Sequence, residues 1–205
     1  MYSKNATIYV AGRSQSKAEA SLDRVKKAFP DSKGRLEFIS LDLADLSTIK
    51  KSADEFKSRE TRLDTLTNNA GVMATPPKSK TPQGHEMQLG TNCLGPWLFT
   101  HHLLPLLQRT AAEAPKNSVR VTWAASLATW YSPKNGVDFD AKTQQPKIGP
   151  IKDMNYGQSK AGNIYMASEF AKRYGKDGIV SVSWNPGMHA APVTSKKYVS
   201  VLTIR

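Results

Sequence analysis

Apolar and polar positions follow two different periods along this chain. Five short runs of β-branched and aromatic residues predict buried strands, because such side chains suit a pleated and covered surface. Between them, apolar residues recur every three or four positions, a spacing typical of helices with one buried face. The five predicted strands are Thr7 to Ala11, Leu36 to Leu41, Leu63 to Thr67, Ser118 to Ala124 and Ile179 to Trp184.

The first two predicted helices have clear starts or ends. Ser14 or Ser16 can cap the first helix, and Pro30 ends it. Ser47 is predicted to cap the second helix. The apolar face of the first comprises Ala18, Leu22, Val25 and Phe29, and that of the second comprises Ile49, Ala53 and Phe56.

Two longer helical patterns follow. One runs from about Glu86 to Ala114, and we expect a kink or break near Pro96 and Pro105 because proline removes a helical hydrogen bond. The other runs from Tyr156 to Tyr174. Proline and glycine predict two irregular surface segments, at residues 74–83 and 131–154.

Strands that alternate with helices predict a mostly parallel sheet covered on both faces, which is a doubly wound α/β fold. We expect one domain over residues 1–205. In such sheets ligands bind beyond the carboxyl ends of the strands. Each predicted strand is followed there by a polar residue or a glycine, namely Arg13, Asp42, Asn69, Ser126 and Gly187. Their convergence predicts a binding site at this edge of the sheet.

Tyr156 and Lys160 lie four residues apart in a predicted helix. They therefore present a phenol and an ammonium on one helix face. A nearby cation favours the phenolate and lowers the pKa of the phenol toward the operating pH. The pair predicts a proton donor, although the same spacing also arises by chance in a lysine-rich chain.

Further motifs give the chain a family resemblance. Asn-Asn-Ala-Gly at 68–71 follows a strand, Thr-Asn-Cys-Leu-Gly at 91–95 lies in the long helical pattern, and Asn-Pro-Gly at 185–187 follows the last strand. With Ser126 and the Tyr156 pair, they keep the order and near spacing of the short-chain dehydrogenase/reductase (SDR) family. The chain resembles that family, with its Rossmann-like fold. The nearest branch contains retinol-dehydrogenase-like, WW-domain-oxidoreductase-like and fungal biosynthetic members.

The resemblance implies four catalytic roles. Tyr156 would give or take the proton at the substrate oxygen, and Lys160 would lower the pKa of Tyr156 and hold the nicotinamide ribose. Ser126 would hydrogen-bond the substrate oxygen, and Asn92 would keep a water-mediated proton relay in place. Two alternatives stay open: Asn92 as a buried amide that ties a helix to a strand, and Ser126 as an ordinary helix cap or turn residue.

The resemblance also implies a nicotinamide cofactor. Arg13 stands where phosphate-preferring members place a basic residue, and its guanidinium can grip a ribose 2′-phosphate in a fork. No acid stands at that turn to receive a free 2′-hydroxyl, so NADP (NADPH) is favoured over NAD. The alternative is a solvent-facing arginine at a turn. Further implied contacts are Asp42 at the adenine edge, Asn69 and Gly71 at the adenosine ribose, and Pro186 and Gly187 at the nicotinamide.

Composition narrows the partners. The formal charge is +12, but lysine and arginine are scattered in ones and twos, which favours a solvated surface over a nucleic-acid site. No stretch is long and apolar enough to cross a bilayer, and no secretory signal is present, so a cytoplasmic location is expected. Cys93 is the only cysteine, which excludes an internal disulfide and a cysteine metal cluster. We expect no metal.

Compared with the family, we expect the fold to be truncated at both ends. The family begins with a strand and a glycine-rich turn that hold the pyrophosphate, and we find no such segment here. That strand lies between the two that match Thr7 to Ala11 and Leu63 to Thr67, so we expect two strand edges to be left unpaired. Only a short segment follows Gly187.

The resulting hypothesis is an NADP-dependent oxidoreductase that moves hydride between nicotinamide and a carbonyl or secondary alcohol of a small molecule, in secondary metabolism. The alternative is a catalytically silent SDR remnant or a binding-only protein. By resemblance, a homodimer could form through the long helix around Asn92 and the Tyr156 helix. Trp97 and Phe99 would lie on that dimer face or pack on the sheet. Substrate and reaction direction do not follow from the sequence.

Overall fold

The structure, a computed structural model, describes residues 1–76, 78–187 and 200–204. Within these residues six strands form one sheet. They are β1 (Thr7–Gly12), β2 (Leu36–Ser40), β3 (Thr65–Asn68), β4 (Val119–Ala124), β5 (Ile179–Trp184) and β6 (Ser200–Ile204).

The described part of the chain also contains five α-helices and several shorter helical turns. The α-helices are α1 (Gln15–Ala28), α2 (Leu46–Arg59), α3 (Met87–Leu89), α4 (Gly95–Glu113) and α5 (Lys152–Tyr174). The 3₁₀ turns are η1 (Tyr2–Lys4), η3 (Leu127–Tyr131) and η4 (Gly175–Asp177), and η2 (Gly90–Leu94) is a π-helical turn. No helix in the described residues is both long enough and apolar enough to span a membrane.

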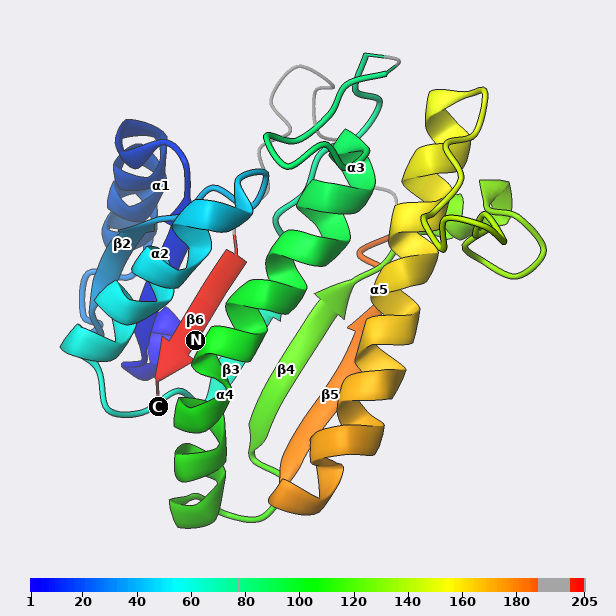
Figure 1. Ribbon diagram of the computed structural model, residues 1–205. Helices are drawn as coiled ribbons and strands as arrows, with labels where there is room; N and C mark the ends of the chain where they lie inside the picture. The colour runs from blue at the N-terminus through cyan, green and yellow to red at the C-terminus, as the bar shows by residue number, and fades with distance from the viewer. Residues whose placement is uncertain (77, 188–199, 205) are drawn as a thin grey trace.

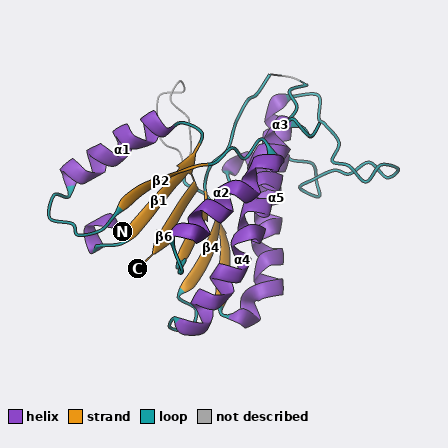
Figure 2. Cartoon of the chain, turned by 60° about the vertical axis from the view of Figure 1, so that its left-hand side comes forward, coloured by secondary structure: helices purple, strands orange, loops and turns teal. Residues whose placement is uncertain are grey.

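The strand order is β2-β1-β6-β3-β4-β5. Strand β1 pairs with β2, β3 with β4, and β4 with β5, all in parallel. Helices α2, α4 and α5 cover one face of the sheet, whereas α1 lies on the other (Figures 1 and 2). The chain runs outward in one direction from β1 and in the other from β3, as right-handed crossovers require. The doubly wound α/β fold is confirmed.

The main core lies between the sheet and the three helices on one face. Trp123 of β4 is fully buried, stacks on Trp97 with ring centroids 6.0 Å apart, and lies 6.1 Å from the ring of Phe170. Phe99 of α4 is also fully buried in this core. Phe99 therefore packs between helix and sheet and is not available for a dimer face, whereas Trp97 packs on the same core but stays half-buried, so its place on a dimer face stays a prediction.

The centre of the sheet corrects one expectation. Strand β6, which we did not predict, lies between β1 and β3 and pairs with both in antiparallel register. Its Leu202 is fully buried opposite Tyr9 on one side and Leu66 on the other. The expectation of two unpaired strand edges is therefore wrong. Five residues are too few to show a period of their own, and the pairing partners of β6 are distant in sequence.

The long helical pattern agrees with its prediction near Pro96 and differs from it near Pro105. The π-helical turn η2 precedes Pro96, which stands in the first turn of α4. Pro105 lies inside α4 without ending it. The irregularity thus lies directly before Pro96, as predicted, in the turn that contains the buried Asn92, and the expected break near Pro105 is wrong.

Two other helix starts differ from the sequence prediction. Asp45, not Ser47, is the N-cap of α2: its Oδ1 accepts a hydrogen bond from Ser47 N at 3.0 Å. A carboxylate at this position also stabilises the helix, because its negative charge lies at the positive end of the helix dipole. Helix α5 begins at Lys152, one turn earlier than predicted, so Tyr156 lies within the helix rather than at its first residue.

Candidate active site

The five positions that follow predicted strands lie at one edge of the sheet. The strands β1 to β5 run parallel, so their carboxyl ends share the edge drawn at the top of Figure 1. The residues that follow them are Arg13 after β1, Asp42 after β2, Asn69 after β3, Ser126 after β4 and Gly187 after β5.

The inner face of α5 docks on the end of β4. Lys160 is buried, and its Nζ donates a hydrogen bond to the Ala124 carbonyl at 2.8 Å. Asn163 Nδ2 donates to the same carbonyl at 2.9 Å. Ala124 is the last residue of β4 and lies two residues before Ser126. Lys160 Nζ also lies 5.6 Å from the centroid of the Tyr156 ring. Lys160 therefore lies near the Tyr156 ring and is hydrogen-bonded to the carboxyl end of β4.

Burial changes the acidity of this lysine. It lowers the pKa of Lys160 to about 8, because the surrounding protein solvates an ammonium poorly. Below about pH 8 the charge is present in both the folded and unfolded chain, and holding it in the interior destabilises the fold. As the pH rises from 8 to 10.5, the folded chain releases this proton first, so the penalty shrinks and stability increases.

Lys160→Met is expected to stabilise the fold at pH 7 by up to about 3 kcal/mol, with the gain disappearing toward pH 10. Urea unfolding followed by tryptophan fluorescence at pH 7 and pH 10 measures both values. The control is Lys172→Met, an exposed position on the same helix. A gain from Lys160→Met that is equal at the two pH values would show that the buried charge is not its source.

Ser126 lies at the start of η3. Its Oγ accepts a hydrogen bond from Ala128 N at 3.1 Å and so caps this turn. The cap role that we left open is therefore present. A hydroxyl that accepts one bond still has its own proton to donate, so capping and substrate binding are compatible.

A glycine brings η3 against α5. A Cβ built on Gly157 would lie 2.6 Å from the Ala128 carbonyl oxygen and 2.9 Å from Ser132 N. Only a residue without a side chain lets the backbone of this turn pack directly on the helix. Since Gly157 follows Tyr156 and Ala128 lies in the turn that Ser126 caps, this contact holds the tyrosine and serine segments together.

Asn92 ties three segments to one another. It is buried in the π-helical turn η2, and its Oδ1 accepts from Val72 N at 2.7 Å. Its Nδ2 donates to the Val72 carbonyl and to Ser159 Oγ, each at 2.9 Å. π-Helical turns are rare and frequently occur at functional sites. The buried-amide alternative for Asn92 fits this geometry, and the proton relay stays a prediction.

The position of Asn92 also explains why the motif at 68–71 ends in a glycine. A Cβ on Gly71 would lie 2.8 Å from Asn92 Oδ1, so glycine is needed for the amide to approach the backbone. Asn69 lies half-buried beside it. We placed Gly71 and Asn69 at the adenosine ribose, and that role stays a prediction.

The start of α1 offers positive charge and amide groups beside Arg13. Arg13 is exposed directly before the helix, and the first turn of α1 contains no acid. Ser14 stands at the N-cap, but its side chain caps no amide there. The first-turn amides and Arg13 together suit a phosphate. Lys17, which is exposed in this same turn, adds a second positive charge there.

The other predicted cofactor residues have local roles. Asp42 Oδ1 accepts a hydrogen bond from Ala44 N at 2.9 Å and shapes the turn after β2. Gly187 has a φ of 79°, which favours glycine, and its amide donates to Asn185 Oδ1. Pro186 is half-buried between them. In the described residues no group of three or more histidine, cysteine or acidic side chains could hold a metal.

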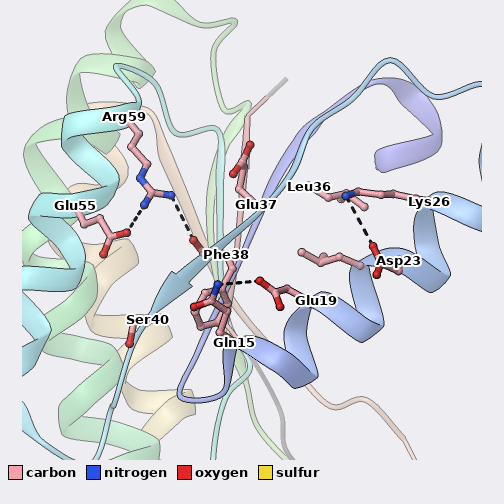
Figure 3. A pocket seen from close by; sticks show the side chains of 11 residues that line it. Gln15, Glu19, Asp23, Lys26, Leu36, Glu37, Phe38, Ser40, Glu55 and Arg59 are labelled. Carbon is pink, nitrogen blue, oxygen red and sulfur yellow. Dashed lines mark hydrogen bonds and ion pairs between the residues drawn. The ribbon is translucent and has the colours of Figure 1, made fainter.

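A hollow of about 420 Å³ lies away from these residues, between α1 and the outer strand β2 (Figure 3). Several of its charged side chains bond to neighbours: Lys26 pairs with Asp23, and Arg59 with Glu55 and the carbonyl of Phe38. The polar lining and these pairs are typical of a solvated surface groove, so we place no chemistry there.

Comparison with known proteins identifies related sequences. The family model described as short chain dehydrogenase matches residues 1–131. A short-chain dehydrogenase/reductase of Emericella nidulans is 50% identical over 190 residues, which cover 92% of this chain and 60% of the relative. One from Phomopsis amygdali is 47% identical over 189 residues, covering 91% and 56%. The chain thus spans a little over half the length of these relatives.

Solved structures share the fold. The complex of Pseudomonas aeruginosa RhlG with NADP has a TM-score of 0.66 and 25% identity, covering 91% of this chain and 64% of that one. The NADPH-bound carbonyl reductase from chicken fatty liver has a TM-score of 0.63 and 23% identity, covering 87% and 67%. At this identity the second likeness shows the fold alone.

Proposed function

The chain belongs to the short-chain dehydrogenase/reductase family, and we propose that it is an NADP-dependent oxidoreductase acting on a carbonyl or secondary alcohol of a small molecule. The observation that supports this proposal most strongly is the inner face of α5. There Tyr156 and Lys160 lie next to the carboxyl end of β4, which leads into Ser126. The fungal origin of similar reductases supports a role in secondary metabolism.

In the proposed reaction, bound NADPH supplies the hydride. Tyr156 donates its phenolic proton to the carbonyl oxygen as this oxygen becomes negative. Ser126 donates a second hydrogen bond to the same oxygen, while its lone pair accepts from Ala128 N. The carbonyl gains one hydride and one proton and becomes an alcohol, and the phenolate recovers its proton from solvent.

Lys160 and Asn92 act on Tyr156 through position and charge. The Lys160 ammonium lies near the phenol and stabilises the phenolate that forms. Asn92 Nδ2 donates to Ser159 Oγ, which itself donates to the Tyr156 carbonyl at 2.8 Å. The amide thereby holds the turn of α5 that carries Tyr156, and we propose that it keeps the relay water in place.

In this proposal the preference for NADPH over NADH depends on residues at the start of α1. Arg13, the first-turn amides and Lys17 would hold the ribose 2′-phosphate. Asp42 would meet the adenine edge, and Asn69 with Gly71 would line the adenosine ribose. Pro186 and Gly187 would shape the nicotinamide pocket.

Arg13→Ala is expected to raise the Kd for NADPH about tenfold and the Kd for NADH less than about twofold, because only NADPH carries the 2′-phosphate. Titration of the purified chain followed by nicotinamide fluorescence measures both. The control is Lys27→Ala, at the far end of the same helix. Equal loss for the two cofactors would contradict the assigned role.

The same titration separates the two hypotheses for the chain. Saturable binding that prefers NADPH supports the oxidoreductase. Absence of binding by the parent chain, with folding verified by circular dichroism, would support the catalytically silent or binding-only alternative.

The remaining sequence expectations stay proposals. They are a single domain over residues 1–205, a cytoplasmic location, the retinol-dehydrogenase-like branch, and a homodimer through the Asn92 and Tyr156 helices. On α5, Ile164 is 40% exposed and would contribute to such a dimer. Light scattering after gel filtration measures the oligomeric state.

A further inference from the structure

A cavity of about 610 Å³ lies between α5, the α3–η2 segment and the excursion that joins η3 to α5. This volume falls within the range of small-molecule sites in proteins. Apolar side chains from all three segments form most of its lining, among them Leu89, Leu94, Phe139, Ile148, Tyr165 and Met166.

The cavity is separate from the candidate active site. Lys160 points from α5 toward β4, where its Nζ bonds to the Ala124 carbonyl. Gly162, which lines the cavity, lies two residues later and therefore about 200° around the helix axis. The cavity thus opens on the side of α5 away from Lys160.

Hydrogen bonds fix the excursion that forms one wall. The buried side chain of Gln158 accepts from Asp138 N and donates to the Lys147 carbonyl, each at 3.0 Å. Tyr165 Oη donates to the Asn135 carbonyl at 2.7 Å. Both ends of the excursion are therefore tied to α5, and the cavity is preformed rather than dependent on a ligand to order it.

The cavity leaves apolar surface in contact with water. Phe139 and Ile148 of the excursion and Tyr165 of α5 are 53%, 51% and 51% exposed. Apolar side chains gathered in a hollow with polar residues among them are typical of binding sites rather than of ordinary surface.

We propose that this cavity binds a neutral, ring-containing apolar small molecule at a site distinct from that of the substrate. Phe139 and Tyr165 offer aromatic rings for stacking. The lining contains one lysine, Lys80, and one acid, Glu86, whose charges are opposite, so the lining has no net preference for anions or cations. Gln145 can hydrogen-bond one polar substituent.

Titration of the purified chain with Nile red, a neutral polycyclic dye that fluoresces in apolar surroundings, tests this proposal. We expect saturable binding of one dye per chain. Ile148→Glu places a charge in the lining and should raise the Kd at least about tenfold. The matched control is Ile151→Glu, because Ile151 lies in the same excursion, is 56% exposed and does not line the cavity. Its effect should be less than about twofold.

A second pair of variants keeps the test independent of one substitution. Phe139→Ser in the lining should weaken binding, whereas Tyr131→Ser, 63% exposed and outside the lining, should not. Circular dichroism verifies folding of each variant. The proposal is overturned if the folded parent binds no dye, or if lining and control variants weaken binding equally.

Two other occupants would give different results. If Val182→Glu, on an exposed position of β5, abolishes binding, the dye occupies the sheet face instead. If dye binding falls as the chain self-associates at higher concentration, measured by light scattering, a second copy covers the cavity. Either result overturns the proposal.

Discussion

Tyr156→Phe is expected to lower turnover by about 10²- to 10⁴-fold, the range typical of a lost general acid. The change removes one hydroxyl and keeps the ring, so α5 and its contacts with β4 should persist. The Kd for NADPH and the Tm should therefore stay close to those of the parent. Carbonyl reduction followed by the loss of NADPH absorbance gives the rate, and cofactor titration gives the Kd.

Tyr165→Phe is the matched control. Tyr165 lies on the same helix, and its hydroxyl bonds to the Asn135 carbonyl, away from the proposed site. Loss of this hydroxyl should leave turnover within about twofold of the parent, because Tyr165 lies about 140° around the helix axis from Lys160. A Tyr156→Phe variant that reduces a carbonyl as fast as the parent would remove the assigned proton donor.

Gly157→Ala is expected to destabilise the fold by about 1–3 kcal/mol and to lower turnover at least about tenfold. The new Cβ would lie 2.6 Å from the Ala128 carbonyl oxygen. The backbone fixes the positions of both atoms, so no side-chain rotation can relieve the clash. Turn η3 must therefore shift relative to α5, which separates Ser126 from Tyr156. Urea unfolding and the same reduction assay measure the two effects.

Gly175→Ala provides the comparison. Gly175 has a helical φ of −63°, and nothing lies within 4 Å of a Cβ built there. Alanine at this site should stabilise the chain by about 0.4–1 kcal/mol, because it restricts the unfolded state. If Gly157→Ala proved as harmless as Gly175→Ala, the contact between η3 and α5 would not be what holds the site together.

Local patterns predicted much of the fold correctly. The runs at Thr7, Leu36, Leu63, Ser118 and Ile179 became β1 to β5 with boundaries close to those predicted. β-Branched runs and helical spacing are properties of neighbouring residues, so they are visible in one sequence. These strands also predicted which edge of the sheet carries the site, because parallel strands place their carboxyl ends together.

Contacts between distant segments were not predicted from the sequence. The cap of α2 moved to Asp45, which also accepts a hydrogen bond from Gln83 Nε2 at 2.8 Å. The irregular turn of the long helix, directly before Pro96, contains Asn92, whose partners Val72 and Ser159 lie 20 and 67 residues away. Asp45 does have a local signal, since aspartate is a favoured N-cap residue that bonds Ser47 N, whereas the long-range bonds of Asn92 have none.

The sequence by itself determined the doubly wound fold, the motifs that resemble the family and the edge where the proposed site lies. Only the tertiary structure decided that β6 fills the centre of the sheet, that Gly157 admits η3, and that Gln158 holds the excursion against α5. Propensity and periodicity depend on neighbours along the chain, and sequence reasoning can follow them. Strand pairing, close backbone approach and side-chain bonding depend on segments that meet only after folding.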